Sequence, residues 1–326
     1  MELIVETPHQ VAEQLLTVRD LVRYGASRFA RAEIYYGHGT DNALDESLAL
    51  VLHALALEHE QINDLWDARA TLGERRAILD LFERRATERV PVPYLTGEAW
   101  FAGIPFMVDE RVLIPRSPMA ELIEADFAPW LAQPPLRILD LCTGGGCIGI
   151  ACALHNADAE VVLADISDAA LDVALANIER HGVGDRVQIV QSDLFEAFEG
   201  ERFDLIVSNP PYVDAQDMSE LPEEYLHEPE LALAAGIDGL DLVRIILRDA
   251  SRHLTDNGAL IVEVGNSWVA LEEVYPTVPF TWIEFERGGH GVFLLTKAQL
   301  EEFADRFVEM GSAEMGSAEM DGRAAV

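Results

Sequence analysis

The chain is poor in basic residues. It has 23 lysines and arginines against 58 aspartates and glutamates, and Lys297 is its only lysine. The resulting net charge of -35 repels phosphate backbones at long range, so we expect no direct sequence-specific contact with nucleic acid. Such acidity would attract a strongly basic protein, or it reflects adaptation to a salty cytoplasm. The sequence is compatible with both causes.

Cysteines and long apolar runs are also scarce. Cys142, Cys147 and Cys152 lie in one short stretch, and an odd number gives no disulfide framework. No CxxC or HxxxH pattern accompanies them, so we expect buried free thiols and no metal site. No stretch approaches the roughly 20 apolar residues of a membrane span, and Met1-Glu2-Leu3 does not begin a secretory signal. The sequence therefore predicts a cytoplasmic protein with no membrane association.

Hydrophobic spacing predicts a small all-helical N-terminal domain over residues 1–90, and we expect this domain to recognise the protein substrate. A loop at 37–42 separates its first helical runs, and Asn42 or Asp45 is the expected N-cap of the second. A third helix is predicted over 72–86. It carries an arginine cluster that we interpret as a solvated face, made of Arg75, Arg76, Arg84 and Arg85.

The pattern changes after residue 90. Prolines at 91 and 93 mark a boundary, and short apolar stretches with turn residues predict a linker with a β-hairpin over 91–116. A larger domain is expected over 117–300. Beyond it, residues 301–326 repeat Gly-Ser-Ala-Glu-Met and offer no apolar run to bury, so an acidic, disordered tail is expected there.

Apolar runs alternate with amphipathic helices in the larger domain. Buried runs joined by helical crossovers predict an α/β fold, with an open parallel sheet covered on both faces. Two late segments, 281–286 and 291–295, are expected to pair antiparallel at its edge. The predicted parallel strands are 137–141, 161–165, 187–190, 203–207 and 259–264.

A glycine-rich loop at 140–149 follows the first strand and opens a helix. Glycines permit a tight turn and let a ligand approach the backbone amides, as they also do in dinucleotide sites. Asp140 beside the loop would repel a pyrophosphate but suits an ammonium group. Asp165 ends the second strand, where a carboxylate can accept ribose hydroxyls. Asp193 follows the third strand and could accept an adenine amine, with Leu194 against the ring.

The fourth strand runs into Asn209-Pro210-Pro211-Tyr212. Two prolines end a sheet ladder and fix a rigid turn. Ligands of open α/β sheets bind at the carboxyl ends of the strands, so this turn is expected to face the glycine loop.

Asn-Pro-Pro-Tyr resembles the signature of class I methyltransferases that act on planar nitrogens of adenine, cytosine or glutamine. The loop Asp-x-x-Thr-Gly-x-Gly, together with motifs between residues 94 and 293, is similar to the protein-glutamine N5 branch, and the resemblance covers about residues 5–300. It implies a Rossmann-like fold with a mixed seven-stranded sheet and S-adenosylmethionine as cofactor. The implied cofactor residues are Asp140, Thr143, Gly144, Gly145, Gly146, Asp165, Asp193, Leu194 and Asn209. The implied catalytic residues are Asn209, Pro210, Pro211 and Tyr212.

Two subfamilies of that branch compete. Residues 98–103, 116–121 and 142–147 look like the subfamily that methylates the third protein of the large ribosomal subunit, rather than the release-factor subfamily. Gly145 departs from the pattern, since serine is commonest there, but a glycine keeps the turn. We therefore expect a glutamine N5-methyltransferase with a basic ribosomal protein as partner. The alternatives are a release-factor methyltransferase, a nucleic-acid adenine N6-methyltransferase, and a non-catalytic ribosome assembly factor.

Overall fold

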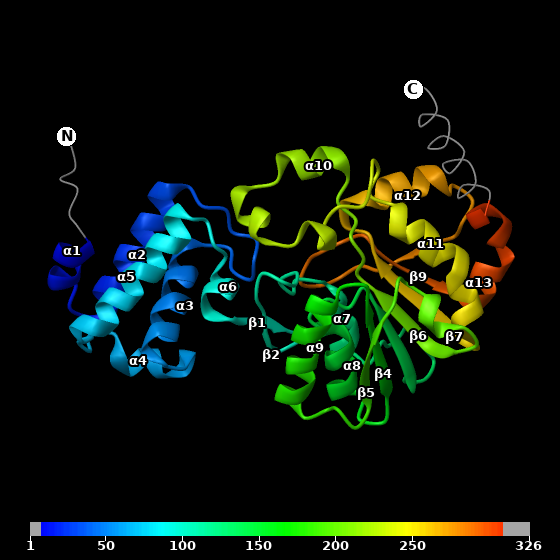
Figure 1. Cartoon of the computed structure of the whole chain (residues 1–326), viewed down its shortest axis with the longest axis horizontal. Coiled ribbons are helices and arrows are strands. Elements are labelled where there is room, and N and C mark those ends of the chain that lie inside the picture. Colours follow the sequence, from blue (N-terminus) through cyan, green and yellow to red (C-terminus); the bar gives the residue numbers. More distant parts are fainter. Residues whose placement is uncertain (1–7, 309–326) are drawn as a thin grey trace, which may run out of the picture. The chain divides into compact units, whose positions relative to one another are not determined.

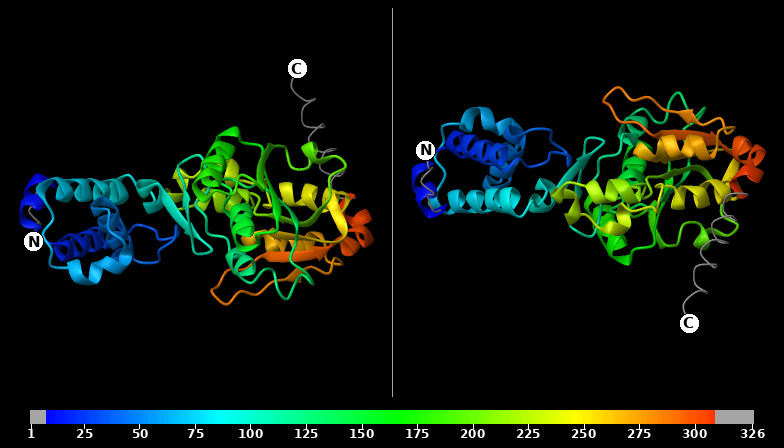
Figure 2. Two further views of the ribbon diagram at one scale, coloured as in Figure 1. Left: turned by 90° about the horizontal axis from the view of Figure 1, so that it is seen from below. Right: turned by 90° about the horizontal axis from the view of Figure 1, so that it is seen from above.

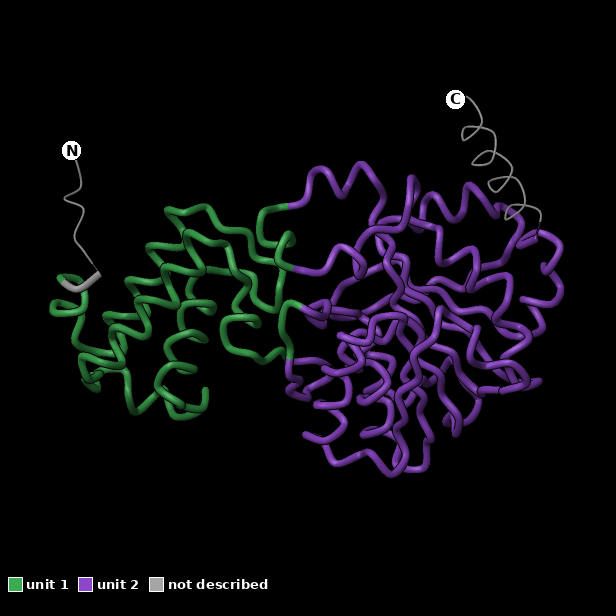
Figure 3. The backbone as a smooth tube through the Cα atoms, viewed as in Figure 1, with its two compact units in different colours: residues 1–99, 108–110, 222–227 green, residues 100–107, 111–221, 228–326 purple. Residues whose placement is uncertain are grey.

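The computed structural model describes residues 8–308 of the chain, which form two compact units (Figure 3). Unit 1 contains the residues up to Ala99 together with two short segments, Val108–Glu110 and Pro222–His227. Unit 2 contains the remaining described residues. The repeats at 311–320, expected to be disordered, lie outside the described residues.

Unit 1 is helical, as the spacing of its apolar residues predicts. Asn42 accepts hydrogen bonds from the amides of Leu44 and Asp45, and is therefore the N-cap of α3. Apolar side chains from α2, α3 and α5 form one core. The helices are α1 (Pro8–Gln14), α2 (Val18–Ala32), α3 (Ala43–Leu55), η1 (His59–Gln61), α4 (Ile62–Leu65), α5 (Leu72–Thr87) and α6 (Val92–Thr96).

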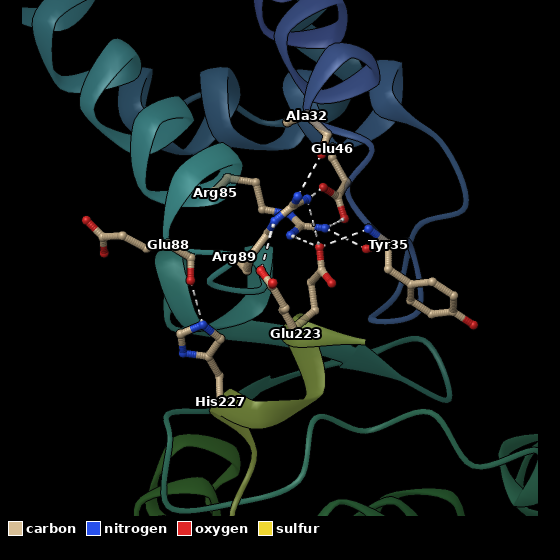
Figure 4. Close-up of polar contacts among 9 residues, drawn as sticks. Ala32, Tyr35, Glu46, Arg85, Glu88, Arg89, Glu223 and His227 are labelled. Atoms are coloured by element: carbon tan, nitrogen blue, oxygen red, sulfur yellow. Dashed lines mark hydrogen bonds and ion pairs between the residues drawn. The ribbon is translucent and has the colours of Figure 1, made fainter. Parts of the chain in front are cut away.

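The arginine cluster on α5 is not uniformly solvated, and for Arg85 that expectation is wrong. Its side chain is fully buried. Its Nε donates to Glu46 over 2.7 Å, its Nη1 to Glu224 over 3.4 Å, and its Nη2 to the Tyr35 carbonyl over 2.8 Å (Figure 4). A buried guanidinium is tolerated because two buried carboxylates compensate its charge.

The segment Pro222–His227 is held in unit 1 by this cluster and by its own neighbours. Glu224 also accepts a hydrogen bond from the Tyr35 amide over 2.9 Å, and Arg89 pairs with it at 3.5 Å. The Tyr225 ring lies 4.5 Å from that of His38. A Cβ at Gly37 would lie 2.5 Å from the Tyr225 hydroxyl, so a larger residue there would displace the tyrosine side chain.

Unit 2 contains a seven-stranded sheet of order β5-β4-β3-β6-β7-β9-β8 (Figure 1). The first five strands in this order run parallel, and β9 is antiparallel to both of its neighbours. A separate two-stranded sheet joins β1 (Glu98–Phe101) to β2 (Ile104–Met107). The strands of the large sheet are β3 (Arg137–Leu141), β4 (Glu160–Asp165), β5 (Val187–Gln191), β6 (Phe203–Ser208), β7 (Leu254–Glu263), β8 (Thr281–Trp282) and β9 (Val292–Thr296).

Helices cover both faces of the sheet (Figures 1 and 2). Alternate strand residues enter two cores, so that Ile138 packs on the side of α7, α8 and α9, and Leu139 on the side of α11 and α13. The helices of unit 2 are α7 (Met119–Glu124), α8 (Cys147–His155), α9 (Asp168–His181), η2 (Glu196–Phe198), α10 (Ala215–Glu220), η4 (Glu230–Ala232), α11 (Asp241–Asp249), η5 (Ala250–His253), η6 (Gly265–Ser267), α12 (Trp268–Val274) and α13 (Lys297–Glu302); η3 (Glu223–His227) lies in unit 1.

This architecture confirms the predicted mixed seven-stranded sheet preceded by a helical region. The late antiparallel pair forms as expected, but β9 inserts beside β7 and leaves β8 at the edge. The folded chain also continues past residue 300, because Phe307 is buried in the core. Within residues 8–308, no helix is long and apolar enough to cross a membrane. The three cysteines are free, with Cys152 buried and the other two half-buried.

Candidate active site at the carboxyl ends of the strands

The glycine loop turns directly from β3 into α8. Gly144 and Gly146 have φ of +54° and +82°, a conformation that L side chains rarely adopt. A Cβ at Gly146 would also lie 3.0 Å from Ile150 and Leu163. A Cβ at Gly144 would meet nothing within 4 Å. The loop therefore combines a tight turn with backbone that borders open space, as a bound ligand requires.

Asp140 lies fully buried beneath this loop. Its Oδ2 accepts hydrogen bonds from the Thr143 hydroxyl over 2.5 Å and from the Gly149 amide over 2.9 Å. Its Oδ1 is buried and has no hydrogen-bond partner among the described residues. Burial raises the pKa of Asp140 to about 7. A carboxylate with one unpaired buried oxygen fits a cofactor that brings a positive charge to the loop.

Asp165 lies at the carboxyl end of β4, next to the same loop. It accepts hydrogen bonds from the amides of Gly144 and Ser167, each over 2.9 Å. Burial raises its pKa, although these two hydrogen bonds oppose the shift. The hydrogen bond from Gly144 thus joins Asp165 to the glycine loop.

Asp193 and Leu194 follow β5 in a turn. Asp193 is exposed, whereas Leu194 is buried and has φ of +46°. The Ser192 amide donates to the Asp165 carbonyl over 3.0 Å, which links this turn to the end of β4. The residues predicted after three successive strands therefore meet along one edge of the sheet.

The Asn-Pro-Pro-Tyr turn begins beside the glycine loop. Ser208 pairs in register with Leu141, and its hydroxyl donates to the Leu141 carbonyl over 2.8 Å. Asn209 therefore leaves the sheet next to Cys142, the first loop residue. Within residues 8–308 no hydrogen bond engages the half-buried Asn209 side chain, and none reaches the carbonyl oxygen of Pro210. Neither oxygen is therefore engaged by another described residue, with Asn209 half-buried and Pro210 buried.

Tyr212 is fixed at both its hydroxyl and its backbone. The hydroxyl donates to Glu263 Oε1 over 3.0 Å, and the Ser267 hydroxyl donates to the Tyr212 carbonyl over 2.7 Å. A Cβ at Gly265 would lie 2.5 Å from the Tyr212 ring, so only glycine allows this packing. The aromatic ring is consequently held in one orientation next to Asn209 and Pro210.

Glu263, which ends β7 at the same edge, belongs to a motif that carries the family resemblance, but no role is predicted for it from the sequence. It accepts hydrogen bonds from Tyr212 and, over 2.5 Å, from the Ser117 hydroxyl. Burial raises the pKa of Glu263, against the lowering effect of these hydrogen bonds and of Arg116. The sequence did contain a signal for Glu263. It is an acidic residue at the end of a predicted strand, as Asp140, Asp165 and Asp193 are at or after theirs.

Asn177 on α9 was also missed. Its Nδ2 donates to the carbonyls of Gly145 over 2.9 Å and Met107 over 3.1 Å, and its Oδ1 accepts from the Met107 amide over 2.7 Å. Asn177 therefore holds the glycine loop at Gly145 and links it to Met107. A buried asparagine in an amphipathic helix has no distinctive sequence pattern, so nothing local pointed to it.

The known proteins that this chain is similar to are methyltransferases. A family model described as methyltransferase small domain matches residues 127–236. The ribosomal protein uL3 glutamine methyltransferase of Francisella tularensis subsp. tularensis (strain SCHU S4 / Schu 4) is 48% identical over 299 residues, covering 91% of this chain and 95% of the relative. A protein of the same name from Neisseria gonorrhoeae (strain ATCC 700825 / FA 1090) is 48% identical over 294 residues, covering 90% and 98%.

Among solved structures, a methyltransferase from Pyrococcus furiosus is similar at 18% identity and a TM-score of 0.44, covering 60% of this chain and 89% of that one. The family model and the two relatives confirm the resemblance that the motifs suggested. The two relatives also favour its ribosomal-protein subfamily over the release-factor subfamily.

Proposed function

We propose, from the premise that this chain belongs to the family of ribosomal protein uL3 glutamine methyltransferases, that it transfers a methyl group from S-adenosylmethionine to the side-chain N5 of a glutamine in that ribosomal protein. The observation that carries the proposal is the pairing of Ser208 with Leu141, which sets the free Asn209 amide beside the glycine loop. The chain is a methyltransferase. One group of its residues would bind the cofactor, and another would orient the glutamine amide.

S-adenosylmethionine would supply a methyl group already activated on a sulfonium. The loop Thr143–Gly146 would cradle its amino-acid end, and Asp140 would balance the ammonium charge from beneath the loop. Asp165 would accept the ribose hydroxyls. Asp193 would accept the adenine amine, with Leu194 packed against the ring. Support comes from the unpaired Oδ1 of Asp140 and from the hydrogen bond between Asp165 and Gly144.

Asn209 and Pro210 would hold the glutamine. An amide nitrogen is a poor nucleophile, because its lone pair is delocalised into the carbonyl. The Asn209 side-chain oxygen and the Pro210 carbonyl oxygen would each accept one amide proton, which aims the nitrogen and raises its electron density as charge develops. The rings of Pro210 and Pro211 restrict the turn, so these acceptors are oriented before the substrate binds.

Tyr212 would stack on the planar amide and exclude water. Glu263 and Ser267 hold this residue through its hydroxyl and its carbonyl, so the ring loses little entropy on binding. No strong base is needed, because the proton leaves an already positively charged product nitrogen. Transfer is therefore a matter of orientation and of excluding water.

The acidity of the chain suits a basic ribosomal protein. Opposite net charges would accelerate encounter and raise affinity at low salt. The substrate affinity should therefore weaken as ionic strength rises, and a salt-independent complex would favour adaptation to salt as the cause of the acidity. Since ribosomal proteins are made in the cytoplasm, we also propose that the enzyme acts there.

The test is methylation of purified uL3 and purified release factor, in parallel, with labelled S-adenosylmethionine. We expect label in uL3, at one glutamine. Label in the release factor alone would assign the chain to the other subfamily, and no label in either would contradict the proposed activity.

A further inference from the structure

Two apolar side chains of unit 2 are exposed between the Asn-Pro-Pro-Tyr turn and α11. Ile237 is 90% exposed and Leu231 is 62% exposed. Scattered exposed apolar residues are normal on a protein surface. Ile237 differs from them because the backbone that carries it is rigid and is tied to the candidate active site.

The turn that presents Ile237 is held on both sides. Gly236 and Gly239 have φ of +81° and +75°, and a Cβ at Gly236 would lie 2.2 Å from the Asp241 carboxylate. Asp238 between them forms a bidentate pair with Arg244, one bond of which is 3.0 Å, and accepts from the Leu240 amide over 3.2 Å. Ile237 is therefore fixed outward rather than carried by a free loop.

The same turn contacts Tyr212. A Cβ at Gly239 would lie 2.3 Å from the Tyr212 carbonyl oxygen, so the two backbones are in close contact. The next residue, Val213, forms a parallel bridge with Ala234: its amide donates to the Leu233 carbonyl over 2.9 Å, and its carbonyl accepts from Ala235 over 3.0 Å. The position of Ile237 is thus set by the turn that would hold the glutamine.

The segments on either side of the bridge between Val213 and Ala234 carry acidic side chains. Helix α10 starts two residues after Val213, and Glu230 is exposed on η4. From Val213 to Asp241 the chain has nine acidic residues and no lysine or arginine. Some of these acids, such as Glu228 and Asp238, pair with arginines elsewhere in the fold. The acids that give this surface its negative charge are Asp214, Asp217, Glu220 and Glu230.

We propose that helix α10 and residues 230–240 form the docking surface for the basic protein substrate, with Ile237 packing on an apolar side chain close to the methylated glutamine. The proposal rests on the proposed function. A basic protein whose glutamine reaches Asn209 must lay its flanking residues over neighbouring loops of the sheet edge, and this surface is joined to Tyr212. Its charge complements that of the substrate, and its rigidity limits the entropy lost on binding.

The apolar part is tested with Ile237→Ser in the full chain. We expect the KM for purified uL3 to rise about tenfold, the effect of losing roughly 1.4 kcal/mol of buried apolar contact. The kcat and the Kd for S-adenosylmethionine should not change, and Ile237→Val should retain the low KM. The matched control is Leu136→Ser, another exposed apolar residue, just before the amino end of β3. An unchanged KM in Ile237→Ser, or an equal rise in Leu136→Ser, would overturn the proposal.

The charged part is tested with the double variant Glu220→Gln, Glu230→Gln. The KM for uL3 should rise less steeply with salt than in the wild type, because two of the attracting charges are gone. Asp158→Asn with Glu160→Gln, two exposed acids at the amino end of β4, is the control and should keep the wild-type slope. Equal slopes in both variants would refute the charged contact.

The failure of this inference and that of the proposed function are distinguishable. A wild-type chain that does not methylate uL3 refutes the function before any variant is compared. A wild-type chain that methylates uL3, with Ile237→Ser of unchanged KM, refutes the docking surface alone.

Discussion

Asp140 gives the sharpest prediction about cofactor binding. Burial raises its pKa to about 7, so at pH 5.5 only about 3% of the ligand-free chain carries the negative charge, and at pH 7.0 about half does. A bound ammonium favours the ionised carboxylate. If cofactor binding keeps Asp140 ionised throughout this range, the Kd at pH 5.5 should be about 15-fold weaker than at pH 7.0.

The raised pKa of Asp140 determines whether cofactor affinity increases or decreases with pH. A carboxyl whose pKa is raised in the ligand-free fold must lose its proton before the cation binds well, so affinity increases as pH rises towards and through 7. The α-amine of the cofactor stays protonated below pH 7, since such amines titrate near 8.

The perturbation is Asp140→Asn. The asparagine oxygen can still accept from Thr143 and Gly149, so the loop should keep its shape while the charge is lost. At pH 7.0 the affinity should fall about tenfold or more, the effect of removing a charged partner. Isothermal titration calorimetry with S-adenosylmethionine at pH 5.5 and 7.0, at constant ionic strength, measures both chains. A flat wild-type profile, or an equally steep one in Asp140→Asn, would refute the reasoning.

Three further predictions concern other parts of the chain. Asn209→Ala should lower kcat about 100-fold or more with a nearly unchanged cofactor Kd. A comparable loss of cofactor affinity would leave Asn209 only the cofactor-binding role that the family resemblance implies. Asp165→Ala should weaken cofactor binding, measured by calorimetry, and an unchanged Kd would remove its ribose role. Glu46→Ala should lower the free energy of unfolding by about 3–5 kcal/mol in urea titration, because it leaves Arg85 short of a partner. The exposed Arg84→Ala should cost under about 1 kcal/mol, and equal losses would contradict the buried cluster.

The large sheet and its glycine loop were predictable from sequence because the signals are local. Each parallel strand contains an apolar run with a polar residue at or next to its carboxyl end, as Asp140 in β3 and Asp165 in β4 show. The rule that ligands bind at the carboxyl ends of parallel strands then brings these residues together. Asn209 joins the group because two prolines directly after a buried strand force a rigid turn at that same edge.

The parts that escaped prediction depend on partners far away in the chain. Arg85 is buried through Glu46 and Glu224, which are 39 and 139 residues away, so its neighbours on α5 gave no sign of burial. The role of Glu263 depends on its contacts with Tyr212 and Ser117, which only the assembled sheet creates. The position of β9 beside β7 is likewise a property of the topology rather than of a local pattern.

The central claim is that Asn209 and Pro210 present a glutamine amide to the methyl donor. It is tested most directly by mass mapping of uL3 from a strain lacking this enzyme, after incubation with S-adenosylmethionine and either the wild-type chain or Asn209→Ala. We predict a single added methyl group on one glutamine side chain with the wild type, and none with Asn209→Ala although that variant still binds the cofactor. Methylation by Asn209→Ala at the wild-type rate, or a methyl group on another type of residue, would contradict the account.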